Sequence, residues 1–254
     1  MPRYFLEVKY SGALYSGFQV QKNAVTVQSV LEDSMAVYFR DKISLTGSSR
    51  TDAGVHALQN YFHFDFEEEV NPQFIYKMNA ILPDDIVVRR IIPMPALAHA
   101  RFDATGRQYE YRLHRFKNPF LRDRSLYYPF TLNRALMDEA AAFLKGQTNY
   151  FAFAKTNTQV KNFECRIITS EWILAEGGLT YHIEANRFLR GMVRLITASL
   201  LRIGRHKLSP EQFHGLFKGD EKCGLSVPPY GLFLKSVRYP ENYFPAPGLS
   251  FTGF

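Results

Sequence analysis

The chain has 254 residues, of which 46% are hydrophobic and 22% are charged, a composition that excludes a disordered protein. Its formal net charge of +7 favours an anionic partner such as a nucleic acid, although charge alone does not establish one. The two cysteines form no C-x-x-C pair and no disulfide framework. With no apolar signal segment and no apolar run of about 20 residues, we expect a soluble cytoplasmic protein with no membrane span.

The first half of the sequence predicts strands and helices in alternation. Leu6, Val8 and Tyr10 alternate with polar residues, which is the period of a half-buried strand. Thr26 is a suitable N-cap for a helix that follows it. The remaining predicted elements are a strand over 62–66, a helix from Pro72 that ends before Pro83, a strand over 86–92, and a loop that holds Pro93 and Pro95.

The second half gives a similar pattern. Two alternating segments, 166–174 and 179–185, flank Gly177-Gly178 and predict a β-hairpin. The other predicted elements are a strand over 109–113, a helix over 136–144 that ends before Gly146, helices over 193–201 and from Pro210, and a strand over 231–239. The tail from Pro240 is expected to be irregular. We therefore predict an α+β protein with two similar halves, 1–104 and 105–254.

The segment Gly47–Ala57 is small, polar and rich in glycine, and it lies between two predicted strands. Loops carried on rigid elements are a common place for catalytic groups. Asp52 in this segment is a candidate catalytic carboxylate, and Arg50 and Asp52 could hold each other's charge. The alternative is a structural turn in which Asp52 caps main-chain N–H groups.

Five blocks of the sequence, in order, resemble the TruA family of tRNA pseudouridine synthases. One is Arg50-Thr51-Asp52-Ala53-Gly54-Val55-His56-Ala57, in which the preceding Ser49 stands where the family usually has glycine. The others are Asn79–Ile86, His99–Ala104, Tyr109–Arg112, and Phe188–Leu200 with its Met192-Val193-Arg194. Five blocks spread over nearly the whole chain are far more specific than one motif of eight residues.

The resemblance implies a role for four residues. Asp52 aligns with the family's catalytic aspartate, Tyr109 with the tyrosine that stacks on the target base, and Arg50 and Arg194 with arginines around the aspartate. It further implies two α+β halves around a long mixed, mainly antiparallel sheet with flanking helices and a basic cleft between the halves. It implies a homodimer that modifies uridines in the anticodon stem-loop of tRNA, at positions 38 to 40, in the cytoplasm.

The chemistry of pseudouridine formation suits these residues. The reaction breaks a C–N glycosidic bond, turns the uracil and forms a C–C bond, without redox change, so we expect no metal and no other cofactor. It needs an ionised nucleophile that attacks either C1′ of the sugar or C6 of the uracil. A neighbouring arginine favours the ionised carboxylate. Tyr109 would hold the detached ring by stacking, although a core ring on a strand face, shared with Tyr111, is the alternative.

Positive charge gathers in two further places. Arg187, Arg190 and Arg194 fall at i, i+3 and i+7, which predicts either a solvated stripe on one helix face or a split face in contact with RNA. Four arginines lie near Tyr109 in the sequence: Arg101, Arg107, Arg112 and Arg115. Asp84-Asp85 follows Pro83 and is interpreted as a turn cap, because adjacent strand residues point to opposite faces.

Two rival functions remain. A non-catalytic RNA-binding homologue would keep the positive charge and would not need Asp52. A phosphoryl-transfer enzyme with an aspartyl nucleophile would need further acidic residues for Mg²⁺, and the segment around Asp52 offers none. The seven His and two Cys show no zinc-ligand spacing, and no phosphate-binding glycine motif is present.

Overall fold

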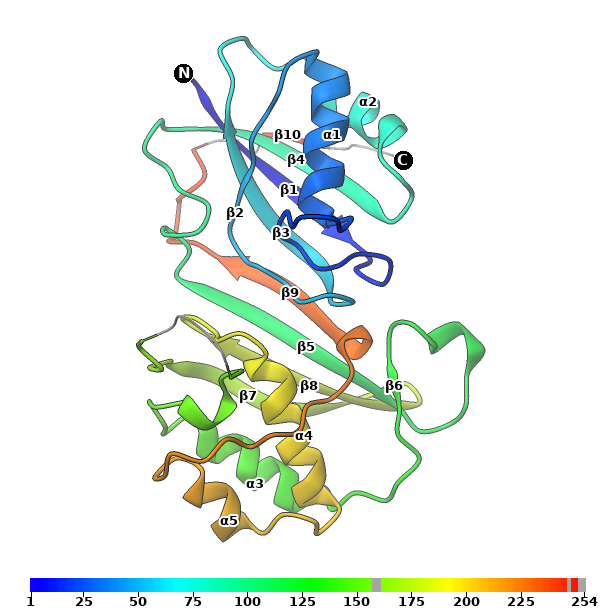
Figure 1. The fold of residues 1–254 in the computed structure, drawn as a ribbon, viewed down its shortest axis with the longest axis vertical. Helices are drawn as coiled ribbons and strands as arrows, with labels where there is room; N and C mark the ends of the chain where they lie inside the picture. The colour runs from blue at the N-terminus through cyan, green and yellow to red at the C-terminus, as the bar shows by residue number, and fades with distance from the viewer. Residues whose placement is uncertain (157–160, 246–247, 251–254) are drawn as a thin grey trace. The chain divides into compact units, whose positions relative to one another are not determined.

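The computed structural model (Figure 1) describes residues 1–156, 161–245 and 248–250. The chain divides into two compact units: unit 1 is Met1–Thr105 together with the segment from Leu234 onward, and unit 2 is Gly106–Phe233. This division differs from the predicted halves 1–104 and 105–254, because the segment from Leu234 returns to the N-terminal unit. In each unit mainly antiparallel strands are flanked by helices, which confirms the α+β class.

Unit 1 is built on a sheet whose strands lie in the order β10-β4-β1-β3-β9, with β2 against β3. β1 pairs antiparallel with both β3 and β4. The strands are β1 (Arg3–Tyr10), β2 (Thr46–Gly47), β3 (His56–Asp65), β4 (Ile86–Met94), β9 (Leu232–Arg238) and β10 (Leu249–Ser250). β10 lies in the tail that was predicted to be irregular, and it forms because Leu249 and Ser250 pair with the edge of β4.

The helices of unit 1 are α1 (Val27–Phe39) and α2 (Phe74–Ile81). α1 begins after Thr26 as predicted, and the Thr26 side chain accepts a hydrogen bond from the Ser29 main chain in a capping box. α2 begins at Phe74, later than predicted from Pro72, after a turn in which Phe74 N donates to the Asn71 carbonyl at 2.8 Å. Pro93 was predicted to lie in a loop but lies inside β4.

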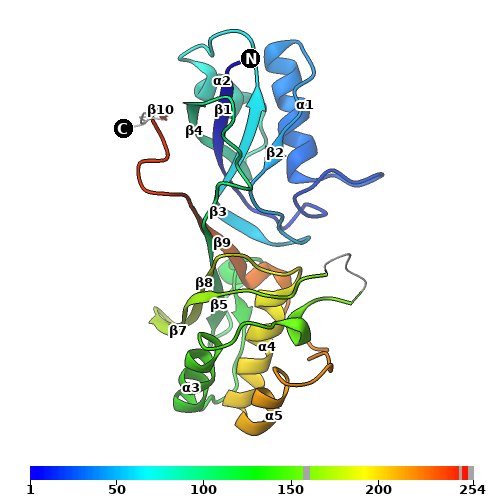
Figure 2. The ribbon, with the colours of Figure 1, turned by 90° about the vertical axis from the view of Figure 1, so that its left-hand side faces the viewer.

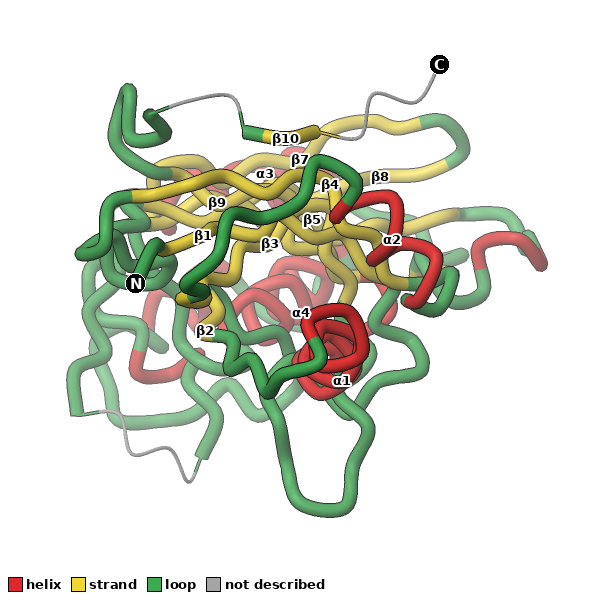
Figure 3. Tube along the Cα trace, turned by 90° about the horizontal axis from the view of Figure 1, so that it is seen from above, coloured by secondary structure: helices red, strands yellow, loops and turns green. Residues whose placement is uncertain are grey.

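The sheet of unit 1 is covered on both faces, so β1 is not the half-buried strand that its alternation predicted. Phe5 and Leu6 point to opposite faces, and both side chains are 0% exposed. On one face, Phe5 contacts Tyr243 of the C-terminal segment, with ring centroids 6.0 Å apart. On the other face, where Figure 3 shows α1 beside the strands, Phe39 of α1 contacts Phe64 of β3 at 6.0 Å.

Unit 2 contains the antiparallel strands β5, β8 and β7 in that spatial order, with β6 parallel to β5. Their bounds are β5 (Gly106–His114), β6 (Leu126–Tyr127), β7 (Ile167–Ala175) and β8 (Gly178–Ala185). The predicted hairpin is confirmed, and Gly177 in its turn has a φ of +68°. The helices are α3 (Arg134–Leu144), α4 (Met192–Gly204) and α5 (Pro210–Gly215). Figure 2 shows α3 beside α4, and α3 also packs on β7.

The predicted arginine stripe is wrong, because α4 begins at Met192. Gly191 has a φ of +74°, in the left-handed region, and therefore separates the helix from the segment before it. Arg187 and Arg190 lie in that preceding segment, and only Arg194 belongs to α4. None of the helices among the described residues combines the length and the apolar character needed to cross a bilayer.

Candidate active site

Two of the four predicted site residues lie in unit 1 and two lie in unit 2. Arg50 and Asp52 lie in one loop of unit 1, between β2 and β3. Tyr109 lies on β5 and Arg194 on α4, both in unit 2. The structure thus brings Arg50 and Asp52 together in a short loop and places Tyr109 and Arg194 on regular elements.

The loop around Asp52 turns back on itself at a tight β-turn. Val55 N donates to the main-chain carbonyl of Asp52 at 3.1 Å, and Gly54, the third residue of the turn, has a φ of +77°. A positive φ at this position is typical of a type II turn and explains the glycine. The hydrogen bond that closes the turn is made by the main chain of Asp52, and the role of its carboxylate stays a prediction. The Asp52 side chain is half-exposed, whereas Thr51 and Val55 are buried.

A buried hydrogen-bond network holds the loop just before Asp52. The Tyr10 hydroxyl lies 2.9 Å from the Thr51 hydroxyl. Asn60 Nδ2 donates to the Ser49 carbonyl at 3.0 Å and to the Tyr10 hydroxyl at 3.3 Å, while Asn60 Oδ1 accepts from Ser48 Oγ at 3.0 Å. Burial raises the pKa of Tyr10 to about 12, so its hydroxyl stays neutral. These side chains fix the main chain on the N-terminal side of the candidate nucleophile.

This network was not predicted from the sequence, although the position of Asn60 in its strand indicates it. Asn60 has the same parity as Phe62 and Phe64 in β3, so it falls on the apolar face of the strand. A buried amide needs hydrogen-bond partners. A polar residue at a position of the apolar strand face therefore indicates that its side chain forms hydrogen bonds to another segment of the chain.

The segment between β1 and α1 holds the other side of the loop. A Cβ at Gly12 would lie 2.0 Å from the Val55 carbonyl oxygen, so only glycine allows this close approach. Gly54 N donates to the Tyr15 carbonyl at 3.4 Å, and the Tyr15 hydroxyl donates to Asp85 Oδ1 at 2.6 Å. Asp85 is therefore a partner of Tyr15, and the prediction of a turn cap was wrong for its carboxylate.

Arg50 differs from the expectation that it pairs with Asp52. Its side chain is exposed, and among the described residues no ion pair within 4.0 Å joins Arg50 to a carboxylate. Ion pairs form instead at other arginines, among them Arg3, Arg90, Arg112, Arg124 and Arg134. Arg50 thus brings positive charge to the same loop without a direct contact to its neighbour.

The network predicts that Asn60→Ala slows turnover more than its effect on folding explains. Removing the amide leaves the buried Ser49 carbonyl without this donor, which costs about 1–3 kcal/mol of unfolding free energy. The loop then loses a constraint at Ser49, three residues before Asp52, so we expect kcat to fall by about 10- to 100-fold with little change in KM. The measurement is steady-state turnover alongside thermal unfolding.

Asn79→Ala is the matched control for that change. The Asn79 amide, on α2, bonds twice to the main chain of Val88, at 2.9 and 2.8 Å. Its loss therefore costs comparable stability in unit 1 without touching the loop. Equal loss of kcat in the two variants would assign the effect of Asn60 to stability alone.

Tyr109 lies in the middle of β5, opposite Ile183 of β8. Its ring meets Phe188 edge to face, with centroids 5.1 Å apart and planes at 86°. The side chain is 8% exposed, which is less than a ring on an open surface would show. Edge-to-face contact of this kind fixes the orientation of an aromatic ring.

Tyr111 is a packing residue, in agreement with the prediction. It is 0% exposed, and its hydroxyl donates to the Pro228 carbonyl at 2.9 Å. Burial raises the pKa of Tyr111, which keeps the hydroxyl protonated.

Arg112 is one of the arginines predicted to add positive charge near Tyr109. It pairs with Glu110 and lies 3.9 Å over the ring of Phe233, so the charge of Arg112 is compensated.

Arg194 is held at the start of α4 by the segment that precedes β9. Its Nε donates to the Val227 carbonyl at 2.8 Å, and Val227 N donates back to the Arg194 carbonyl at 3.3 Å. Its Nη2 lies 3.4 Å from Ser226 Oγ. The guanidinium is half-buried and is therefore positioned by main-chain contacts.

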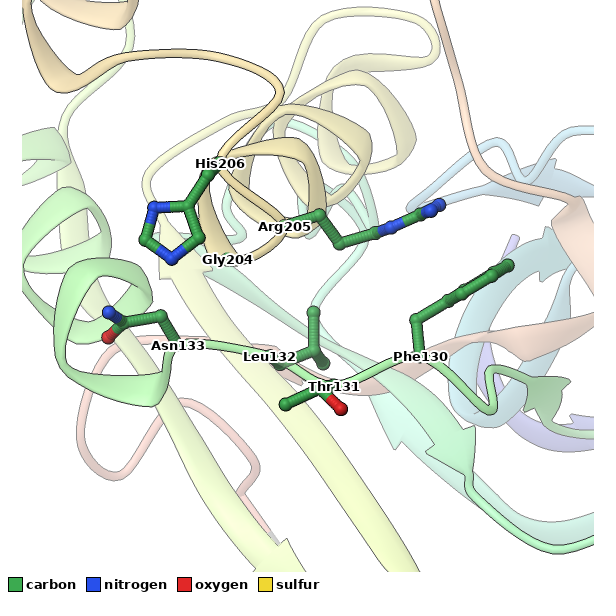
Figure 4. A pocket seen from close by; sticks show the side chains of 7 residues that line it. All are labelled: Phe130, Thr131, Leu132, Asn133, Gly204, Arg205 and His206. Atoms are coloured by element: carbon green, nitrogen blue, oxygen red, sulfur yellow. The ribbon is translucent and has the colours of Figure 1, made fainter.

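A cavity of about 520 Å³ lies in unit 2 at the C-terminal end of α4, away from Arg194 (Figure 4). Figure 4 shows His206 beside Asn133, and Arg205 lies 3.6 Å over the ring of Phe130. Asn133 is already used, because its side chain caps α3 and its N–H donates to the Gly204 carbonyl at 2.7 Å. The cavity contains none of the four predicted site residues. Among the described residues, no three His, Cys, Asp or Glu side chains group as a metal site would require.

The comparisons with known proteins concern nearly the whole chain. A family model described as tRNA pseudouridine synthase matches residues 7–103 and 140–240. Arg50, Asp52 and Arg194 fall inside the matched ranges, and Tyr109 falls between them.

Three relatives are each named tRNA pseudouridine synthase A. The Parabacteroides distasonis protein is 39% identical over 96% of this chain and 99% of its own length. The Bacteroides thetaiotaomicron protein is 40% identical over 96% of this chain and 93% of its own. The Exiguobacterium sibiricum protein is 33% identical over 95% and 98%. At such identity and coverage, the chain belongs to the tRNA pseudouridine synthase family, a family of isomerases.

Proposed function

We propose that this chain converts uridine to pseudouridine in the anticodon stem-loop of tRNA, at positions 38 to 40, with Asp52 as its nucleophile. The observation that supports this best is the Asp52 loop: a half-exposed carboxylate on a turn whose flanking residues are buried and hydrogen-bonded. A nucleophile must reach its substrate while its own main chain stays fixed. Membership of the family supports the reaction, and the resemblance of the loop supports the assignment.

The reaction is balanced without a cofactor. The C1′–N1 bond of the uridine breaks, a C1′–C5 bond forms, C5 loses a proton and N1 gains one. Asp52 attacks either C1′ of the sugar or C6 of the uracil, and in both routes the ionised carboxylate supplies the electron pair. The carboxylate is released again when the new C–C bond has formed.

Of the other three residues, Tyr109 contacts the base, and Arg194 and Arg50 supply positive charge. Tyr109 holds the detached uracil by stacking, a contact worth about 1–3 kcal/mol per base. Its hydroxyl is the candidate for the proton transfer at C5. Arg194, held by the Val227 carbonyl, and Arg50, in the loop itself, attract the phosphate backbone of the RNA.

The test is incubation of the protein with unmodified tRNA, followed by mapping of pseudouridine at nucleotide resolution. Pseudouridine at positions 38 to 40 supports the proposal. Pseudouridine elsewhere would keep the reaction and overturn the site on the tRNA. Tight binding without any pseudouridine would instead support the rival function, a non-catalytic RNA-binding homologue.

We further propose that the protein acts in the cytoplasm, where the tRNA is, as a homodimer. The support for the dimer is the family resemblance. Sedimentation equilibrium at micromolar concentration measures the mass directly, and the chain itself is 29.3 kDa. A mass of about one chain at every concentration would overturn the homodimer and leave the reaction untouched.

A further inference from the structure

A second cavity in unit 2, of about 270 Å³, opens at the N-terminal end of α4. Its walls come from three segments: residues 152–156, the first turn of α4, and residues 222–226. The polar and charged side chains in its lining are Lys155, Thr156, Arg194, Lys222 and Ser226. Within the part of the chain that the structure describes, no acidic residue lines this cavity.

Two cations of this cavity are not paired with carboxylates: among the described residues, neither Lys155 nor Lys222 forms an ion pair. Like charges that converge on one cavity repel each other, so the arrangement is unfavourable until an anion enters. Burial lowers the pKa of Lys222, which an entering anion would raise again.

The cations are held in place by contacts that leave the cavity open. Lys155 N donates to the Arg190 carbonyl at 3.2 Å, and the Lys155 stem lies over Gly191, where a Cβ would be 3.2 Å from Lys155 Cγ. Lys222 Nζ donates to the Phe151 carbonyl at 2.6 Å and lies 3.5 Å from the centroid of the Phe151 ring. The Lys222 ammonium is therefore fixed by two contacts, and the stem of Lys155 is positioned against Gly191.

We propose that this cavity, which we call the Lys155 subsite, binds a backbone phosphate of the RNA substrate. The inference rests on the proposed function, because it takes RNA as the ligand. A phosphodiester offers two charged oxygens that accept hydrogen bonds from lysine, arginine and hydroxyl donors, all of which line the cavity. Arg194 lines the subsite as well, so a phosphate bound there lies beside a residue already assigned to the reaction.

The experiment compares the salt dependence of tRNA binding by the wild-type protein, Lys155→Gln and Lys145→Gln. Lys145 is an exposed lysine at the C-terminal end of α3 in the same unit, and it controls for the loss of one positive charge. At 0.1 M salt we expect Lys155→Gln to bind tRNA on the order of tenfold more weakly. Its slope of log affinity against log salt should be shallower by about one. Lys145→Gln should keep the wild-type affinity and slope.

Each outcome decides the proposal. Equal and small effects of the two substitutions would show that only net charge matters and would overturn the subsite. Calorimetric titration of inorganic phosphate into the protein distinguishes the sources of the anion. If Lys155→Gln abolished phosphate binding without any loss of tRNA affinity, the cavity would be a site for free phosphate. That result would also overturn the proposal. Binding is measured without turnover, so a wild-type protein that forms no pseudouridine would refute the proposed function and not this result.

Discussion

Asp52→Asn is expected to fold and bind tRNA normally and to form no measurable pseudouridine. The amide has nearly the shape of the carboxylate but lacks the negative charge that attack requires. The turn is closed by the main-chain carbonyl of Asp52, which the substitution leaves in place. Loss of a nucleophile typically lowers kcat by at least about 10⁴-fold. The measurement is single-turnover pseudouridine formation at saturating tRNA, with the mass of the variant checked for deamidation.

Asp84→Asn is the matched control, because it makes the same chemical change at another turn of unit 1. Asp84 is exposed in the turn that is closed by Ile86 N and the Pro83 carbonyl at 3.0 Å. Its variant should turn over at the wild-type rate. An active Asp52→Asn protein of correct mass would refute the nucleophile assignment, whichever carbon is attacked.

Tyr109→Ala is expected to lose most activity, while Tyr109→Phe should still bind tRNA. Stacking needs an aromatic face, which phenylalanine keeps and alanine lacks. If the hydroxyl also transfers the proton at C5, the phenylalanine variant binds RNA and turns over slowly. The measurements are tRNA affinity, single-turnover rate and melting temperature of each variant.

Tyr111 provides the control on the same strand face. Tyr111→Ala empties a fully buried position, at a cost of about 3–5 kcal/mol, which corresponds to a fall in melting temperature on the order of 10 °C. Tyr109 is itself 8% exposed, so Tyr109→Ala also lowers stability, and the activity of the folded protein separates the two rings. An active Tyr109→Ala together with an inactive, stable Tyr111→Ala would show that the wrong ring was assigned to the substrate.

Elements whose energetics are local could be predicted from the sequence. The Thr26 cap of α1 and the hairpin at Gly177 depend on residues a few positions apart, and both are confirmed. The arginine stripe was wrong because helical spacing alone placed Arg187 and Arg190 on the helix, whereas α4 begins at Met192. The sequence pattern does not show the conformation of Gly191, whose positive φ ends that run.

The candidate site was predicted only in part. Motif resemblance points to Asp52, Tyr109, Arg50 and Arg194, whose roles stay predictions, and it does not point to the residues that hold the loop. Asn60 lies eight positions after Asp52, yet Tyr10, the hydrogen-bond partner of Asn60, lies 50 positions before Asn60. Such contacts are formed by strand pairing, which a sequence pattern does not specify.

The sequence by itself determined the α+β class, most of the regular elements and the family. Alternation, caps and motifs are properties of residues close together in the sequence, so they do not depend on how distant segments pack. Only the tertiary structure decided which faces are buried and what positions Asp52. The segment from Leu234 returns to unit 1 and covers Phe5 with Tyr243, and Tyr10 and Asn60 meet beside Thr51. The reason is that burial and buried hydrogen bonds depend on which distant segments pack together, and their free energy appears only once the chain has closed the intervening loops.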